Sequence, residues 1–197
     1  MKPLEHTSGG KMSEFDELFK KAAEFHGHVC PGIVLGTRLT IAGLREIGLN
    51  PFENNKDLIV FMEIDRCGTD AVQAITSCSL GHRSLKFRDY GKFAATFVDL
   101  KTKKAVRVAV NEKDRTKHDK LGRSDVISLL SEIPEDEILT VQQVTVPVSE
   151  NDIPGFPSYK TWCSLCGEQI MDHREVVVDG KEVCKNCANE SYYNPVK

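Results

Sequence analysis

Two Cys-x-x-Cys pairs near the C-terminus constrain this chain more than any other feature. Cys163 and Cys166 are followed, after 17 residues, by Cys184 and Cys187. Two residues between a pair of thiolates form a tight turn that presents both sulfurs to one ion, and two such turns complete a tetrahedron. The gap is typical of zinc ribbons. The sequence therefore predicts a zinc site, with a rubredoxin-like iron site as the alternative. This zinc would be structural, because four thiolates leave no open coordination position for catalysis.

The residues around these cysteines predict a small zinc-ribbon or treble-clef-like domain. Residues 176–183 are typical of a hairpin that turns at Asp179-Gly180, and residues 187–190 of the start of a short helix. Residues 151–197 carry five Lys/Arg and seven Asp/Glu, a net charge of −2. This acidic balance argues against nucleic acid as a partner and favours a role in dimer or partner contacts.

The composition of the whole chain fits a globular protein of the cytoplasm. Seven cysteines, an odd number, favour metal or thiol chemistry in a reducing compartment over a disulfide framework. The net charge is −3, so no overall basic field draws anionic partners. No apolar run reaches the roughly 18 residues that a membrane-spanning helix needs, and the first eleven residues lack the apolar stretch of a signal peptide.

The hydrophobic pattern before the cysteine pairs predicts an α+β core, with helices packed on a mainly antiparallel sheet. Helices are expected from Ser13 to His26, over 32–47, over about 70–79 and over 125–131. Strands are expected over 58–64, 85–87, 93–99, 105–110 and 138–148, with a charged loop over 111–123. The predicted organisation is a flexible lead over 1–12, the core over 13–148, a linker over 149–158 and the four-cysteine domain over 159–197.

A second group of metal-ligating residue types lies within the predicted core. His26, His28 and Cys30 alternate along the chain, and Cys30 precedes a predicted helix. Cys67 follows a buried strand and also precedes a helix, with Asp70 three residues on. The positive end of a helix dipole lowers the pKa of a thiol at the helix N-terminus and favours the thiolate. Two such thiols, each at the start of a helix, could converge on one pocket. This pattern favours His28, Cys30 and Cys67 as functional residues, leaves His26 open, and makes Cys78 a buried core residue.

Three motifs in this part of the chain resemble the FmdE-like family, which takes its name from formylmethanofuran dehydrogenase. The first is His26-Gly27-His28-Val29-Cys30-Pro31-Gly32, with Gly36 and Arg38 beyond it. The others are the stretch from Glu63 to Gln73, and Asp89-Tyr90-Gly91-Lys92 with Phe97. The resemblance covers about residues 14–148, departs from the family pattern over 76–85, and extends to the zinc ribbon with which many members end.

The resemblance implies an α+β core, a homodimer and a His/Cys metal site in a cleft. Carried over to this chain, His28, Cys30 and Cys67 would hold a second transition metal, either zinc, iron or nickel. His26 and Asp70 would lie near this metal. Tyr90 and Lys92 would help to line the cleft as candidate cofactor-binding residues.

Three functions remain open at this point. The first is an accessory protein that handles redox equivalents, metal or cofactor for a molybdenum or tungsten oxidoreductase of the formylmethanofuran dehydrogenase type, whose subunits would be its partners. The second is a stand-alone metalloenzyme, with Cys30 as nucleophile or ligand and Asp70 or His26 as general base. In this second case Cys30, Cys67 and Asp70 are the catalytic candidates. The third is a regulator that binds protein or DNA through the zinc ribbon.

Overall fold

The computed structural model describes residues 12–111 and 121–196, and the chain divides into two compact units between Val146 and Pro147. The expected lead thus lies outside the described residues, Met12 excepted, as does most of the expected loop over 111–123. The first unit contains, in chain order, α1 (Glu14–His26), α2 (Pro31–Ile47), β1 (Leu58–Met62), α3 (Cys67–Thr76), β2 (Leu85–Phe87), β3 (Ala94–Asp99), β4 (Ala105–Val110), α4 (Arg123–Glu132), α5 (Glu135–Ile138) and β5 (Leu139–Val144).

Helix α1 lies where the sequence predicts, and α2 begins at Pro31, one residue before the expected start, and ends as expected at Ile47. The hydroxyl of Ser13 accepts a hydrogen bond from the backbone N–H of Asp16 at 3.1 Å, which caps the first turn of α1. Gly27 and Gly48 end α1 and α2 in the left-handed conformation, with φ of 86° and 83°. Pro31 occupies the first turn of α2, where its missing N–H costs no hydrogen bond.

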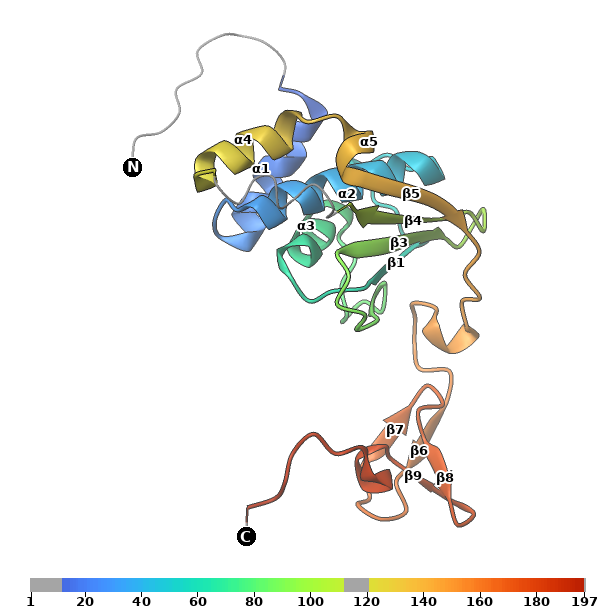
Figure 1. The fold of residues 1–197 in the computed structure, drawn as a ribbon. Helices are drawn as coiled ribbons and strands as arrows, with labels where there is room; N and C mark the ends of the chain where they lie inside the picture. Colours follow the sequence, from blue (N-terminus) through green and yellow to red (C-terminus); the bar gives the residue numbers. More distant parts are fainter. Residues whose placement is uncertain (1–11, 112–120, 197) are drawn as a thin grey trace. The chain divides into compact units, whose positions relative to one another are not determined.

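The sheet has the strand order β2-β1-β3-β4-β5, and all neighbours are antiparallel except β1 and β2. Val60, Phe97 and Val106 lie opposite one another in register and are fully buried. Helix α2 packs closely on this face at Gly43. A β-carbon on Gly43 would lie 2.2 Å from the Phe97 ring. Figure 1 shows the helices of this unit gathered beside the sheet. The α+β prediction is confirmed.

Helix α3 begins three residues earlier than the sequence suggests. Its N-cap is Arg66, and Thr69 does not take that position although its hydroxyl could cap a helix. The Thr69 hydroxyl instead donates to the Ile64 carbonyl oxygen at 2.8 Å, which ties the first turn back to the end of β1. Cys67 is therefore the first residue of the helix.

Other boundaries also differ from the sequence-based expectation: β1 ends at Met62 and not at residue 64, and α3 ends at Thr76 and not at residue 79. Helix α4 begins at Arg123, two residues before the expected 125, and its N-cap is Gly122. The last strand of the sheet is shorter than the predicted 138–148, because Ile138 completes α5 and β5 ends at Val144. No helix within the described ranges is long and apolar enough to cross a membrane.

The second unit is a four-cysteine fold with two small hairpins. Strands β6 (Lys160–Trp162) and β7 (Gln169–Met171) form one hairpin, and β8 (Val176–Val178) and β9 (Lys181–Val183) form the other. Asp179 and Gly180 both have positive φ, as the predicted tight turn requires. A short turn, η3 (Asn186–Glu190), stands where the short helix is expected, and its backbone is non-helical at Ala188 and at Asn189, whose φ is 73°.

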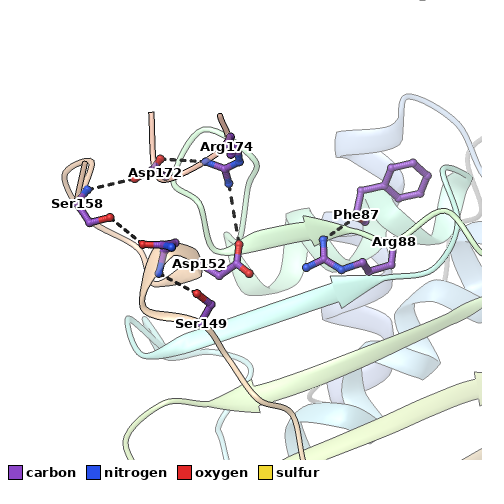
Figure 2. Close-up of polar contacts among 8 residues, drawn as sticks. Phe87, Arg88, Ser149, Asp152, Ser158, Asp172 and Arg174 are labelled. Carbon is purple, nitrogen blue, oxygen red and sulfur yellow. Dashed lines mark hydrogen bonds and ion pairs between the residues drawn. The ribbon is translucent and has the colours of Figure 1, made fainter. Parts of the chain in front are cut away.

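The stretch predicted as a linker, 149–158, folds with the second unit. It contains the 3₁₀ turn η2 (Glu150–Asp152), in which the Ser149 hydroxyl accepts a hydrogen bond from the Asn151 N–H. Figure 2 shows how this stretch is tied to the segment after β7. The Ser158 backbone N–H donates to Asp172 at 3.2 Å, and Arg174 bridges Asp172 and Asp152.

Candidate functional site

The N-termini of α2 and α3 bring two thiols together in the first unit. Cys30 is the N-cap of α2, and Cys67 is the first residue of α3. The two helices approach closely at Gly36 and Gly68, which have no side chains to separate the backbones. A β-carbon on Gly36 would lie only 2.6 Å from the Cα of Gly68. At Gly32, a β-carbon would lie 3.0 Å from the Cys67 Cβ and 3.8 Å from the Cys30 Sγ. Glycine at this position thus keeps space open beside both thiols.

His26 completes a three-residue cluster with these thiols. One ligand atom each from His26, Cys30 and Cys67 lie within 4.8 Å of one another, and the His26 Nε2 is 3.7 Å from the Cys30 Sγ. Cys30 is buried, whereas His26 and Cys67 are partly exposed. The cluster is therefore accessible from one side.

The geometry and chemistry of this cluster fit a soft transition metal. Bond lengths of about 2.3 Å to sulfur and 2.0 Å to nitrogen place tetrahedral ligands roughly 3.5–3.8 Å apart. The His26 to Cys30 separation already matches this spacing. One imidazole and two thiolates suit zinc, iron or nickel better than magnesium or calcium. Three protein ligands leave a fourth coordination position for another molecule.

The environment of Cys67 raises the pKa of its thiol, in contrast to the thiolate that its place at a helix N-terminus was expected to favour. Burial raises the pKa of Cys67, and the adjacent Cys30 and Asp70 add to the shift. A bound cation would reverse this balance, because metal coordination requires the thiolate. Metal binding at this site would therefore release a proton.

The structure places the two histidines differently from the sequence-based expectation. His28 is exposed and does not share the group of close ligand atoms that contains His26. Its ring packs against that of His26, with centroids 4.3 Å apart. The reason is that α1 ends at His26 and the left-handed Gly27 turns the chain, so the two side chains do not continue one extended strand.

Asp70 lies on the far side of the His26 ring. Its Oδ2 is 2.7 Å from the His26 Nδ1, and its Oδ1 accepts a 3.5 Å hydrogen bond from Gln73. Asp70 occupies the first turn of α3, one turn after Cys67. The same turn of helix therefore supplies a thiol and a carboxylate to the site.

The remaining candidates make their contacts elsewhere in the part of the chain that the structure describes. Tyr90 is 64% exposed, and the backbone N–H groups of Tyr90 and Lys92 donate to the Glu63 carbonyl oxygen at 3.2 Å. Cys78 is buried, as expected, and burial raises its pKa. A cavity of about 380 Å³ lies between α1, residues 51–54 and the end of α3, away from the cluster.

Sequence reasoning missed how Arg38 holds α4 on α2 and how two glycines make room beside the thiols. The Arg38 Nη1 donates to the carbonyl oxygens of Leu130 and Ile133 at 2.8 and 2.7 Å, which fixes α4 against α2. Gly32 and Gly68 give the helices room, as described above. A glycine directly after a helix-starting proline, and another directly after Cys67, are the signals that could have pointed to close packing.

The second unit holds the four-cysteine centre. One sulfur each from Cys163, Cys166, Cys184 and Cys187 lie within 4.8 Å of one another. Cys166 and Cys184 have their sulfurs 3.9 Å apart, close to tetrahedral zinc spacing. Backbone N–H groups of Cys166 and Cys184 lower the pKa of Cys163 to about 6, which favours the thiolate that zinc requires.

Comparison with known proteins adds two matches along this chain. Residues 25–140 match the family described as "FmdE, Molybdenum formylmethanofuran dehydrogenase operon". Residues 157–193 match the prokaryotic dksA/traR C4-type zinc finger. The four cysteines of the second unit all fall within this second match, so this unit is a zinc finger with the ligands for one structural zinc.

This chain is also similar to individual proteins. A curated protein of Archaeoglobus fulgidus, described as a probable S-adenosyl-L-methionine-binding protein, is 34% identical over 92% of this chain. The chain spans about half of that relative's length, 55%. The crystal structure of a tungsten formylmethanofuran dehydrogenase FmdE-like protein from Syntrophus aciditrophicus has a TM-score of 0.61 and 21% identity. That alignment covers 91% of this chain and 95% of the other, and it shows a shared fold.

Proposed function

This chain belongs to the FmdE family and ends in a C4-type zinc finger, and we propose that its core binds a second transition metal through His26, Cys30 and Cys67. One observation carries this proposal. One imidazole nitrogen and two sulfurs lie within 4.8 Å of one another, with His26 and Cys30 from one stretch of the chain and Cys67 from another. When bound, such a metal would supply a Lewis-acidic or redox centre with one position open to a small ligand.

We further propose that this site serves as an accessory to an oxidoreductase of the formylmethanofuran dehydrogenase type. The family match, named for the operon of that enzyme, supports this role. The partly exposed Cys67 and His26 also support it, because a metal held there would be reachable by a partner or a small molecule. The protein would act as a homodimer. Co-purification with the dehydrogenase subunits, compared between wild type and Cys67→Ser, tests the accessory role.

Metal content measured by mass spectrometry tests the core site. The full chain should carry two metal ions when it is purified without chelators or an affinity-nickel column. Cys67→Ser and Cys30→Ser should each carry one, because the zinc finger keeps its own ion. Cys78→Ser is the matched control, since Cys78 is buried outside the cluster and should leave the count at two. One metal ion per wild-type chain would refute the core site.

S-adenosylmethionine is a second candidate ligand. The support is the 34% identity with the relative of that name, which extends over 92% of this chain. Equilibrium dialysis with radiolabelled S-adenosylmethionine tests this candidate directly. Binding that disappears in Cys67→Ser would place the ligand at the thiol cluster, whereas no binding to the wild type would exclude this candidate for the residues present here.

A further inference from the structure

We propose that Asp70 and His28 are positioning residues that hold His26 as the nitrogen ligand of the core site. This inference rests on the proposed function, because it specifies how the same three-ligand site is oriented. It assigns different roles to the two histidines of the His26-Gly27-His28 motif. His26 would meet the metal, and His28 would support the His26 ring.

The Asp70 contact fixes which nitrogen of His26 carries the proton. An ionised carboxylate can only accept hydrogen bonds, so the 2.7 Å contact requires a proton on the His26 Nδ1. The Nε2 lone pair is then free, and this is the atom that faces the Cys30 Sγ at 3.7 Å.

The fold places Asp70 on the same helical turn as the Cys67 thiol. Cys67 and Asp70 are three residues apart on α3, so they lie on one side of the same helical turn. A shift of this turn would move a sulfur ligand and the partner of the nitrogen ligand together. A carboxylate behind a ligating histidine also raises the basicity of the imidazole, and loss of such a partner typically costs about 10–100-fold in metal affinity.

His28 packs against the His26 imidazole ring and restrains its rotation. Its ring lies 4.3 Å from that of His26, with 37° between the planes, and its own side chain faces solvent. With Asp70 hydrogen-bonded at one edge and His28 against its face, the His26 ring has little freedom to rotate. The His26 side chain is 12% exposed.

Metal affinity in a graded set of variants tests the role of Asp70. The full chain, with zinc retained in the finger, is titrated with Co²⁺ against a competing chelator, and the thiolate-to-cobalt charge-transfer absorption is followed. Asp70→Ala should weaken Co²⁺ binding by about 10–100-fold while keeping the charge-transfer band. Asp70→Asn keeps one acceptor oxygen and should fall between. Asp65→Ala, which removes a nearby exposed carboxylate, is the control and should bind as wild type.

The tautomer of His26 provides a second test of Asp70, because it would not change if Asp70 only stabilised the fold. Long-range ¹H–¹⁵N correlation spectra of the full chain, with zinc in the finger and no metal in the core site, should show the Nδ1–H form in wild type and in Asp65→Ala. The same spectra should show a mixture of tautomers in Asp70→Ala. Circular dichroism checks that each variant is folded. An Asp70→Ala protein that is folded and has wild-type Co²⁺ affinity would overturn the inference but leave the proposed metal site standing.

Substitution of the two histidines separates ligand from support. His28→Phe keeps an aromatic ring against His26 and should keep two metal ions per chain, whereas His26→Asn should keep one. The reverse result would make His28 the ligand and overturn the inference. A wild-type chain with a single metal ion would instead overturn the proposed function itself, so the two failures are distinguishable.

Discussion

A β-carbon on Gly36 would lie 2.6 Å from the Cα of Gly68, so the backbones of α2 and α3 are in direct contact at this pair. Gly36 lies one turn beyond the start of α2, and Gly68 directly follows Cys67. This contact sets the distance between the two helix N-termini that carry the thiols. The spacing of the candidate metal site is therefore decided by two residues that have no side chain.

Gly36→Ala should both destabilise the first unit and weaken its metal site. The added methyl group would force α3 away from α2, and overpacking of this kind costs about 1–3 kcal/mol. Urea unfolding and metal content measure the two effects. Gly81→Ala is the control, because a β-carbon there meets no atom within 4 Å. Wild-type stability and two metal ions in Gly36→Ala would contradict this account of the helix contact.

Arg107→Ala should be strongly destabilising. Arg107 makes two hydrogen bonds, of 2.7 and 2.8 Å, to the carboxylate of Glu63, whose side chain is 8% exposed. Removal of the arginine would leave a buried charge without its partner, which costs about 3–5 kcal/mol. Denaturant unfolding gives the value.

Arg45→Ala is the matched control for this prediction. Arg45 also pairs with a glutamate, Glu135, but the arginine is 52% exposed. Solvent screens this pair, so its removal should cost less than about 1 kcal/mol. Equal losses of stability in the two variants would show that burial of Glu63 is not the deciding factor.

Asp99 should contribute stability that depends on pH. It is buried, and burial opposes its ionisation. Hydrogen bonds from the Thr102 hydroxyl and the Lys101 N–H outweigh burial, so the pKa of Asp99 lies below its usual 3.8. Its contribution is present in full above the unfolded-state pKa and is lost as the pH falls through the lower folded-state value.

Asp99→Asn should therefore lose about 1 kcal/mol at pH 7, with a smaller loss near pH 3. Urea unfolding at a series of pH values tests this. A difference from wild type that stays constant down to pH 3 would show that the hydrogen bonds do not depend on the charge of Asp99.

Cys184→Ser should release zinc and unfold the second unit locally. That unit has a small apolar core around Ile170 and Val183, so the metal must supply much of its folding free energy. Hydrogen exchange should show lost protection in β8 and β9 and retained protection in β3 and β4. Cys184→His, which offers zinc another ligand, is the control and should retain the metal. Loss of protection in β3 and β4 as well would refute independent folding of the two units.

Most helices and strands could be predicted because the residues that specify them are close together in the sequence. Ser13, Gly27 and Gly48 act on their own helix ends, and the strands of the sheet carry their own apolar pattern. The start of α3 could not be predicted in this way. Thr69 has the chemistry of a helix cap, but its hydroxyl bonds to Ile64, and only the folded turn makes that carbonyl available.

The sequence by itself determined the zinc finger, because each Cys-x-x-Cys pair forms its half of the site within one tight turn. It also determined the α+β composition of the first unit and the presence of imidazole and thiol groups there. Only the tertiary structure decided which of them meet. Cys30 and Cys67 are 37 positions apart, and their approach depends on helix packing at Gly36 and Gly68. The choice between His26 and His28 depends on the turn at Gly27 and on Asp70, which lies 44 residues further along the chain than His26.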